Sequence, residues 1–166
     1  FSTEELKGFW RDHRCNLKVL KFILFLLPWL ISGLLFKVDF KYYDMLNLPS
    51  FVLPSKLIGI IWIIIYLLIT ISLYKISKTE KIVGNNDLFY VLITNYLANQ
   101  LFLYGFFNLK SPFLGFILTT ITMVSSIFLF LEIKKLNKNA SYYLIPYIVY
   151  SIYALILSLS IYIMNF

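Results

Sequence analysis

The chain has 166 residues, of which 60% are hydrophobic and only 14% charged, and its formal net charge is +7. A soluble domain carries about 25% charged residues and cannot hide so much apolar surface. This composition excludes an ordinary soluble enzyme, a disordered chain and a DNA-binding module. The basic residues cluster between apolar runs, which is typical of membrane topology, so we expect no nucleic-acid partner. One cysteine, Cys15, and one histidine, His13, cannot form an intrachain disulfide or a structural zinc site, so no metal is expected.

Five stretches without charged residues predict membrane-spanning helices. They contain 15 residues after Lys21, 18 after Lys56, 22 after Asp87, 21 after Lys110 and 28 after Lys138. A spanning helix needs about 20 residues, and apolar residues before Lys21 extend the first run. The runs are continuous, whereas a barrel strand alternates in polarity. We therefore expect an all-α, integral membrane bundle of five transmembrane helices, at 17–36, 57–74, 88–107, 113–131 and 142–163.

The leader before the first span differs from the spans in its charge. Ser2 followed by Glu4 and Glu5 is typical of a capped helix start. We expect residues 1–16 to form an amphipathic interfacial segment ahead of a five-helix domain at 17–166. A role as a topology anchor is favoured over a binding role.

The basic residues also predict the orientation. On the side of the leader lie eleven: Lys7, Arg11, Arg14, Lys18, Lys21, Lys75, Lys78, Lys81, Lys134, Lys135 and Lys138. On the other side lie four: Lys37, Lys41, Lys56 and Lys110. The positive-inside rule then places the N-terminus inside and the C-terminus outside. The richness in Ile, Lys, Asn and Tyr indicates an AT-rich genome and favours a bacterial cytoplasmic membrane.

The connection between the first two spans, residues 37–56, is longer than the others and holds Pro49 and Pro54. Each proline restricts φ and biases the residue before it to extended structure. We expect a rigid segment whose apolar side, with Tyr42, Tyr43 and Phe51, lies over one end of the bundle. Interfacial anchoring by the tyrosines is the alternative.

Three helices carry polar or aromatic residues at spacings that share one face. The sets are Trp62, Tyr66 and Ile69 on the second helix, Asn95, Asn99, Phe102 and Phe106 on the third, and Tyr147, Tyr150, Ala154 and Ser158 on the fifth. Amides in a membrane need partners, so Asn95 and Asn99 are expected inside the bundle. The aromatic residues on the same faces then point inward and can wall a cavity for a flat, apolar ligand. From periodicity alone, ordinary helix packing is the favoured explanation of each face.

The same residues belong to three sets that follow one another along the chain. The connection and second helix hold Tyr42-Tyr43, Leu46, Leu48-Pro49, Phe51, Leu53-Pro54, Gly59, Trp62 and Ile65-Tyr66. The third helix and the turn after it hold Asn99, Phe102, Phe106-Phe107 and Pro112. The fifth helix holds Pro146-Tyr147, Tyr150, Tyr153-Ala154, Leu157-Ser158 and Asn165. In residue type and spacing these sets resemble the TspO/MBR family, the tryptophan-rich sensory proteins and translocator proteins, over about residues 22–165. The chain departs from the family where Leu48 replaces a lysine and Phe51, Phe102 and Tyr150 replace tryptophans.

The resemblance implies a receptor or sensor that binds porphyrins and related tetrapyrroles in a cavity closed by the first connection. It assigns the ligand-binding wall to Trp62, Tyr66, Asn99, Phe102, Phe106, Tyr147, Tyr150 and Ala154, and the lid to Pro49 and Phe51. The expected partners are a tetrapyrrole or another flat apolar molecule, the lipid bilayer and a second copy in a homodimer. No catalytic residue and no obligatory cofactor are expected, although a porphyrin- or heme-type ligand fits.

Two alternative functions remain at this point. The first is a porphyrin-degrading membrane enzyme, for which the resemblance implicates tryptophans at the positions of Trp62 and Tyr150. Because only Trp62 is a tryptophan here, we expect weak or absent degradation. The second is a transporter of small apolar solutes, but the second, third and fifth spans hold no charged residue for an ion-coupled relay.

Two further features leave alternatives open. Asn99 can join helices or hydrogen-bond the polar edge of a ligand, and we expect the second. Gly115, Thr119, Thr122 and Ser126 form a face of small residues on the fourth helix, which can pack within the bundle or across a dimer.

Overall fold

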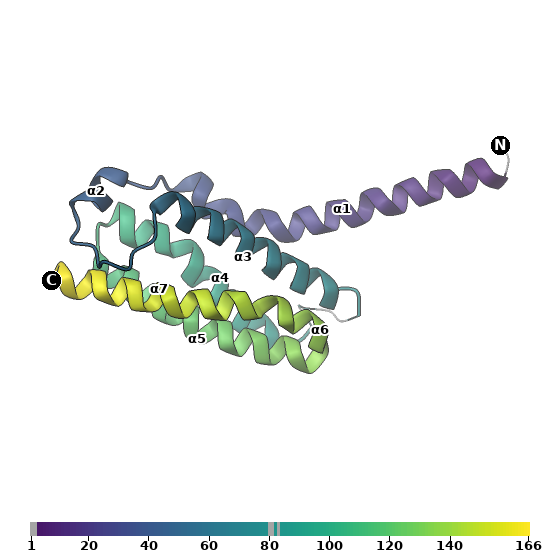
Figure 1. Cartoon of the computed structure of the whole chain (residues 1–166). Coiled ribbons are helices and arrows are strands. Elements are labelled where there is room, and N and C mark those ends of the chain that lie inside the picture. Colours follow the sequence, from purple (N-terminus) through teal and green to yellow (C-terminus); the bar gives the residue numbers. More distant parts are fainter. Residues whose placement is uncertain (1–2, 80–81, 83) are drawn as a thin grey trace.

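The computed structural model describes residues 3–79, 82 and 84–166, and in these residues it is built from helices alone (Figure 1). The long helices are α1 (Thr3–Leu35), α3 (Ser55–Ile76), α4 (Asn86–Leu103), α5 (Pro112–Leu136) and α7 (Ile145–Met164). Shorter elements connect or extend them, namely α2 (Phe40–Met45), the π-helix η1 (Tyr104–Asn108), α6 (Lys138–Ser141) and the 3-10 helix η2 (Tyr142–Leu144).

The predicted all-α, five-helix membrane bundle is confirmed, with one long helix at each predicted span. Among the described residues, four segments are long and apolar enough to cross a membrane: His13–Leu35, Ser55–Ile76, Pro112–Leu136 and Lys138–Met164. The remaining long helix, α4, carries the buried polar residues Asn95, Asn99 and Gln100. These amides hydrogen-bond within the bundle, as a membrane interior requires.

The first helix is longer than the predicted span. α1 is continuous from Thr3 to Leu35, so no break separates the predicted segment 1–16 from the membrane helix. Its N-terminal half extends beyond the end of the bundle (Figure 1). The buried residues of α1, Trp29 and Ser32, both lie in its C-terminal half.

The predicted third helix, 88–107, changes its winding before it ends. The α-helix α4 stops at Leu103 and continues as η1, whose wider turn brings both Phe106 and Phe107 into buried positions. Gly115 of α5 lies directly against this turn, because a Cβ at that position would be 2.6 Å from the Cδ2 atom of Phe106. The absence of a side chain at Gly115 therefore permits the close approach of α5 to η1.

Two other predicted boundaries differ by a few residues. The fourth helix continues past 131 to Leu136, because Glu132 and Lys135 are compatible with a helix and form an ion pair (2.6 Å) on its surface. The fifth begins as the 3-10 helix η2 and becomes an α-helix only at Ile145. Pro146 in the first turn explains this start, since it has no N–H to donate to a preceding α-turn.

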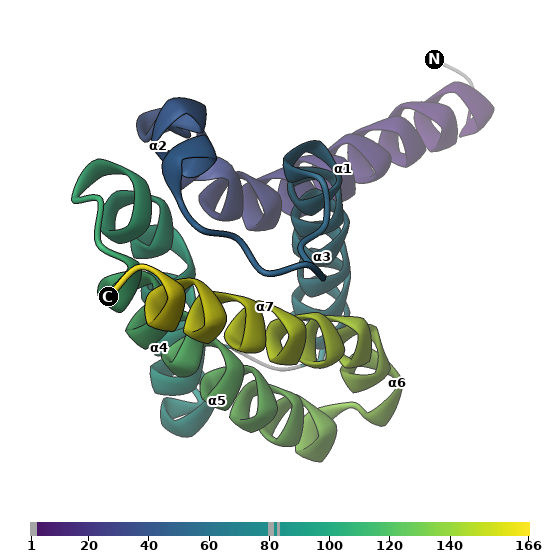
Figure 2. The ribbon, with the colours of Figure 1, turned by 60° about the vertical axis from the view of Figure 1, so that its left-hand side comes forward.

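Two clusters of buried side chains divide the bundle along its length. The aliphatic cluster, at the end where α6 lies, includes the fully buried Ile69, Ile76, Leu129, Ile133 and Leu144. The aromatic cluster, at the end where α2 lies, is formed by Tyr42, Phe106, Phe107, Leu157 and Ile161. Around both clusters α5 packs against α4 and α7, and α1 packs against α3 and α4 (Figures 1 and 2).

The connection between α1 and α3 has more structure than the two prolines predict. It contains the short helix α2, whose start is capped by the Asp39 carboxylate, which accepts a hydrogen bond from the N–H of Tyr42 (3.0 Å). Asp39 also pairs with Lys110 (3.6 Å), which follows η1. After α2 the chain runs toward α7 and then turns back into α3 (Figure 2). The connection therefore lies across one end of the bundle.

Candidate functional site

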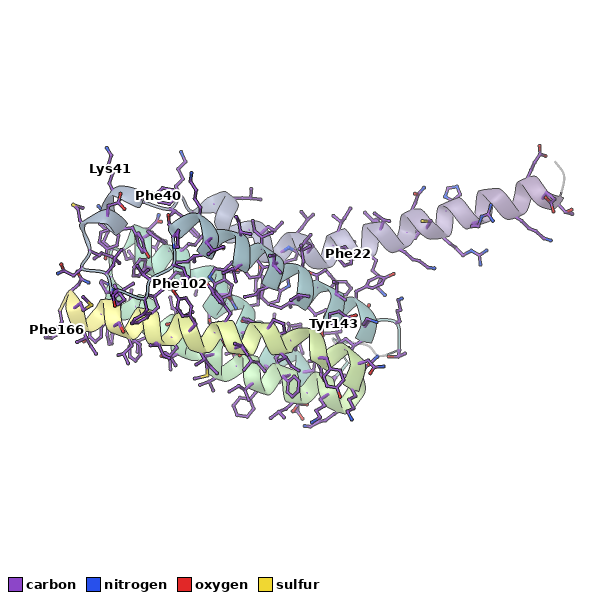
Figure 3. The ribbon with its side chains drawn as sticks, viewed as in Figure 1. Phe22, Phe40, Lys41, Phe102, Tyr143 and Phe166 are labelled. Atoms are coloured by element: carbon purple, nitrogen blue, oxygen red, sulfur yellow. The ribbon has the colours of Figure 1, made fainter. Side chains whose placement is uncertain are left out.

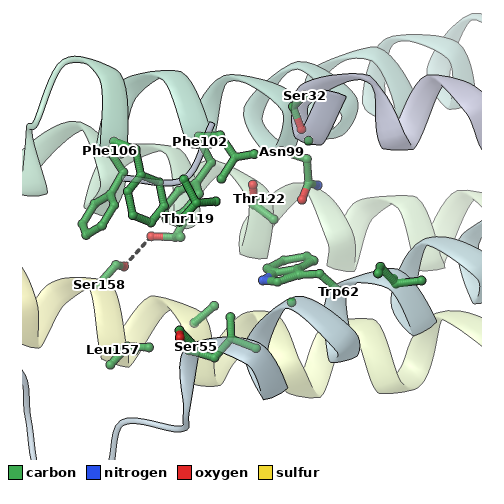
Figure 4. Close-up of a pocket in the computed structure, with 18 of the residues that line it drawn as sticks. Ser32, Ser55, Trp62, Asn99, Phe102, Phe106, Thr119, Thr122, Leu157 and Ser158 are labelled. Carbon is green, nitrogen blue, oxygen red and sulfur yellow. Dashed lines mark hydrogen bonds between the residues drawn. The ribbon is translucent and has the colours of Figure 1, made fainter. Parts of the chain in front are cut away.

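A cavity of about 600 Å³ lies within the end of the bundle that holds the aromatic cluster. Its wall is contributed by α1, α3, α4, η1, α5 and α7, and by the connection that covers this end. In Figure 4 Asn99, Phe102 and Phe106 face Trp62 across this space. The lining is mostly aromatic and aliphatic, with a small number of polar groups, as is typical of a small-molecule site.

Most of the predicted ligand-binding residues lie on the wall of this one cavity. They are Trp62 and Tyr66 of α3, Asn99 and Phe102 of α4, Phe106 of η1, and Tyr150 and Ala154 of α7. Their rings contact one another: Phe102 stacks on Phe106 with centroids 5.4 Å apart, and Trp62 meets Tyr150 edge to face at 5.5 Å. Whether they contact a ligand stays a prediction, but the structure brings them together.

Tyr147 is the exception, because it lies behind the wall and not on it. Its side chain is fully buried. Its hydroxyl accepts a hydrogen bond from Nδ2 of Asn99 (2.6 Å) and donates one to Oδ1 of Asn95 (2.9 Å). Nδ2 of Asn95 in turn donates to the carbonyl of Thr122 and to the Ser125 hydroxyl. Tyr147 thus joins α7 to α4 and α5 beneath the cavity.

This network determines how Asn99 faces the cavity. Because the carbonyl of Thr122 can only accept, it sets the direction of every hydrogen bond from Asn95 through Tyr147 to Asn99. Nδ2 of Asn99 is the donor in that network, and it also donates to the backbone carbonyl of Asn95 (3.1 Å). Its Oδ1 atom accepts no hydrogen bond from the part of the chain that the structure describes. Asn99 therefore joins helices through one atom and can offer the other to a ligand.

Other polar groups on the wall are also without a protein partner. Within the described residues, no hydrogen bond is made by the indole N–H of Trp62, the hydroxyls of Tyr66 and Tyr150, or the side chain of Ser32. The hydroxyl of Tyr43 is buried without a partner, and desolvation raises its pKa. Each of these groups would cost free energy if a purely apolar molecule covered it. The wall therefore suits a flat apolar ligand with polar groups at its edges.

The predicted lid residues do not line the cavity. Pro49 is buried in the connection, and the side chain of Phe51 is 45% exposed, with its ring against that of Tyr153 (6.4 Å). The connection is held over the cavity by other groups. The hydroxyl of Tyr153 accepts from the N–H of Leu53 (3.1 Å) and donates to the carbonyl of Phe51 (3.3 Å).

A second attachment ties the connection to the end of α7. The N–H of Asn47 donates to Oδ1 of Asn165 (2.8 Å), and Nδ2 of Asn165 donates back to the carbonyl of Asn47 (2.9 Å). Nδ2 of Asn47 also donates to the carbonyl of Met164 (3.3 Å). We call these contacts the asparagine latch. Together with Tyr153 it closes the side of the cavity that faces α7.

The small-residue face of α5 packs inside the bundle. Gly115 contacts η1, the Thr119 hydroxyl hydrogen-bonds that of Ser158 beside the cavity (Figure 4), and Ser126 hydrogen-bonds Ser151 (3.3 Å). Of the two roles that the sequence left open for this face, the structure shows packing within one chain.

Comparison with known proteins identifies the family. The sequence profile of the TspO/MBR family matches residues 22–164, which is most of the chain. The chain belongs to the TspO/MBR family. The membrane protein YtaB of Bacillus subtilis, described as uncharacterized, is 33% identical over 134 residues, covering 81% of this chain and 86% of that protein. The tryptophan-rich protein TspO of Bacillus cereus is 31% identical over 135 residues, covering 81% of this chain and 88% of that protein.

Several wall residues of this TspO/MBR protein were missed by the sequence reasoning. They are Trp29 and Ser32 of α1, Tyr43 of α2, Thr119 and Thr122 of α5, and Phe107, Tyr153 and Ser158 around the latched end. The sequence placed Thr119, Thr122 and Ser158 only on helix faces, and Tyr43 only in the connection. For Trp29 the contact with Gln100 appears only in the structure, where the amide donates to its backbone carbonyl.

Proposed function

We propose that this TspO/MBR protein is a membrane receptor that binds a porphyrin-type tetrapyrrole in the cavity beneath the α1–α3 connection. The observation that carries the proposal is the aromatic cavity, whose wall presents hydrogen-bonding groups that have no partner within the described residues. Its volume of about 600 Å³ lies within the range of roughly 300–1,000 Å³ typical of small-molecule sites.

The shape of the wall supports a flat ligand. Phe102 and Phe106 are almost parallel, with 9° between their ring planes, and Trp62 faces them across the cavity (Figure 4). A planar macrocycle between the two phenylalanines and Trp62 could form offset-stacked contacts with these rings. Polar groups at its edge could reach Oδ1 of Asn99 and the hydroxyl of Tyr66, both of which lie on the wall.

The proposal includes the setting of the receptor. The N-terminus lies inside and the C-terminus outside a bacterial cytoplasmic membrane, because the basic clusters favour that orientation. The two ends of the described chain lie at opposite ends of the molecule, as an odd number of spans requires (Figure 1). The functional unit is a homodimer, and since the small residues of α5 are used inside the bundle, the contact between copies uses another face.

A titration of the purified protein with protoporphyrin IX tests the proposal. Saturable quenching of tryptophan fluorescence is expected, and its absence in a folded protein would refute the receptor assignment. Tyr66→Phe removes a hydroxyl from the wall and should weaken binding, whereas Tyr90→Phe, at an exposed tyrosine of α4, should not. Asn99→Leu should weaken binding by about 5- to 150-fold, which corresponds to about 1–3 kcal/mol for a stranded polar group.

Illumination of the complex distinguishes a receptor from a porphyrin-degrading enzyme. Trp62 and Tyr150 both line the cavity, so the residues at the implicated positions are in place, although one is a tyrosine. A receptor keeps the Soret band of the bound porphyrin in the light. Rapid loss of that band, abolished by Trp62→Phe, would favour the enzyme instead.

A further inference from the structure

The wall of the cavity is exposed on one side only. The exposed members include Gly33 and Leu34 near the end of α1, Phe40 at the start of α2, and Lys56, Gly59 and Ile63 in the first turns of α3. The wall residues from α4, η1, α5 and α7 are buried or half-buried. The cavity therefore reaches the surface between α1 and α3.

Two glycines lie at this opening and keep it free of side chains. Gly33 and Gly59 both line the cavity, and a Cβ at either position would have no atom within 4 Å apart from its own chain neighbours. Each sits on a candidate membrane span, Gly59 one turn inside the start of α3. The opening thus faces sideways, near the level where a membrane helix meets the headgroups.

The neighbouring seam, between α1 and α4, is closed by hydrogen bonds. Nε2 of Gln100 donates to the carbonyl of Trp29 (3.2 Å), and its Oε1 accepts from the N–H of Ser32 (2.9 Å). The hydroxyl of Tyr96 donates to the carbonyl of Pro28 (2.9 Å). These bonds use backbone groups of α1 around its internal proline and fasten α1 to α4.

The opposite seam, between the connection and α7, is closed by the asparagine latch and by Tyr153. A ligand that used either closed seam would have to break several hydrogen bonds at once. Passage between α1 and α3 breaks none of these hydrogen bonds, and the exposed lining there consists of apolar side chains, glycines, Ser55 and one lysine.

That lysine, Lys56, is the cation at the opening. It lines the cavity and is exposed, and its ammonium makes no ion pair within the described residues. It lies in the first turn of α3, where Pro54 provides no side-chain cap and the N–H groups of the turn favour negative charge. An acidic group held here would remain at the membrane interface while an apolar body entered the cavity.

We propose that the ligand enters from the lipid sideways between α1 and α3, and that Lys56 at this opening binds its carboxylate. The contact between Lys56 and a carboxylate rests on the proposed receptor function, whereas the entrance between α1 and α3 concerns access from the bilayer alone. The ligand class is a flat amphiphile dissolved in the membrane, with an acidic group at one edge.

The opening is tested without any porphyrin. In a Trp10→Phe, Trp29→Phe background Trp62 is the sole tryptophan, and it lies on the cavity wall. In bilayers of phosphatidylcholine with dibrominated acyl chains, Trp62 should be quenched, and Gly59→Phe should remove much of that quenching. Ile60→Phe, one position further on the exposed surface of α3, is the matched control and should change nothing. Equal quenching in the Gly59→Phe and control proteins would overturn lateral access.

The role of Lys56 is tested with protoporphyrin IX and its dimethyl ester, which lacks the acids. Lys56→Gln should weaken binding of the acid by about 2- to 5-fold, the scale of an exposed ion pair, and leave the ester unchanged. Lys41→Gln is the control, because Lys41 points away from the bundle (Figure 3). If Lys56→Gln weakened binding of the acid and of the ester equally, the contact between Lys56 and the carboxylate would be refuted. Lys56 would then bind lipid phosphate instead.

The two kinds of failure can be told apart. If the wild-type protein binds neither porphyrin, the proposed receptor function fails, and quenching of Trp62 by brominated lipid still decides whether the opening exists. If both porphyrins bind, the association rate from loaded vesicles should fall by about 10-fold or more in Gly59→Phe and not in Ile60→Phe. An unchanged rate would refute this entrance while leaving the receptor intact.

Discussion

The two ends of the bundle are built from the same helices but differ in how they fill space. Along α3, the second half places Ile69, Leu73 and Ile76 in the aliphatic cluster, where their exposure is at most 2%. The first half places Gly59, Trp62 and Tyr66 around the cavity. The branched aliphatic side chains interdigitate, whereas the rings, glycines and small hydroxyl residues of the other end surround the cavity. One end is therefore packed as a core, and the other leaves space for the proposed ligand.

The polar network of Tyr147 lies at the boundary between the two ends. Its members are satisfied by one another, so it stabilises the bundle without a ligand. On the cavity wall, Trp62, Tyr66 and Tyr150 make no side-chain hydrogen bond within the described residues. Asn99 lies at the boundary between paired and unpaired polar groups, because its Nδ2 atom has protein partners and its Oδ1 atom has none within the described residues.

The same truncation at the two ends should give the largest contrast. Leu129→Ala in the aliphatic cluster creates a new void at a side chain with no exposure and should lower the free energy of unfolding by about 2–5 kcal/mol. Leu157→Ala only enlarges the existing cavity and should cost clearly less. Unfolding in mixed micelles with increasing sodium dodecyl sulfate, followed by circular dichroism, measures both. Equal losses would show that the cavity end is as tightly packed as the other.

A pair of tyrosine substitutions sharpens the comparison of polar groups. Tyr147→Phe removes both hydrogen bonds of the buried hydroxyl, to Asn99 and to Asn95, and should destabilise the protein by about 1–3 kcal/mol. Tyr66→Phe removes a hydroxyl with no protein partner, so it should leave unfolding nearly unchanged while it weakens porphyrin binding. The same unfolding assay and a fluorescence titration separate these effects. Loss of stability in Tyr66→Phe would mean that its hydroxyl supports the fold.

Sequence patterns predicted much of the difference between the two ends, but not the contacts that close the cavity end. Run lengths without charge identified each span, and the requirement for paired amides placed Asn95 and Asn99 inside the bundle. Of the eight residues predicted to bind a ligand on the second, third and fifth spans, seven lie on the cavity wall. These features depend on local spacing, which a sequence displays directly.

What was missed depends on contacts between residues far apart in the chain. Asn47 and Asn165 form the latch across 118 positions, and neither carries a local signal of its partner. The resemblance assigned the lid to Pro49 and Phe51, and the hydrogen bonds that hold the connection in place come from Tyr153 and the latch. The π-turn of η1 likewise follows from the fit of Phe106 against Gly115, which appears only when α5 packs on α4.

Breaking the latch should lower stability modestly and leave ligand exchange nearly unchanged. Asn165→Ala removes both side-chain hydrogen bonds to Asn47, which are exposed and worth about 0.5–1.5 kcal/mol each. Because the proposed route runs between α1 and α3, the porphyrin dissociation rate should stay nearly unchanged. A rate about 5-fold faster, as expected for about 1 kcal/mol, would mean that the connection opens during exchange. Stopped-flow dilution measures this rate, with Asn139→Ala on α6 as the control. An unaltered dissociation rate would agree with exchange through the opening between α1 and α3 alone.

The smallest expected effect concerns the start of the connection. The hydrogen bond from the N–H of Tyr42 lowers the pKa of Asp39, and Lys110 nearby lowers it further, against a smaller cost of burial. A carboxylate whose pKa is lowered on folding stabilises the folded form above its unfolded pKa of about 3.9, and that contribution is lost as the pH falls through the folded value. Below about pH 4 the amides of α2 should therefore exchange hydrogen faster, relative to an unstructured peptide at the same pH. Asp39→Asn should remove this acid-dependent step. If Asp39→Asn shows a step of the same size, the step belongs to another titrating group. The cap on α2 would then make no contribution that depends on the charge of Asp39.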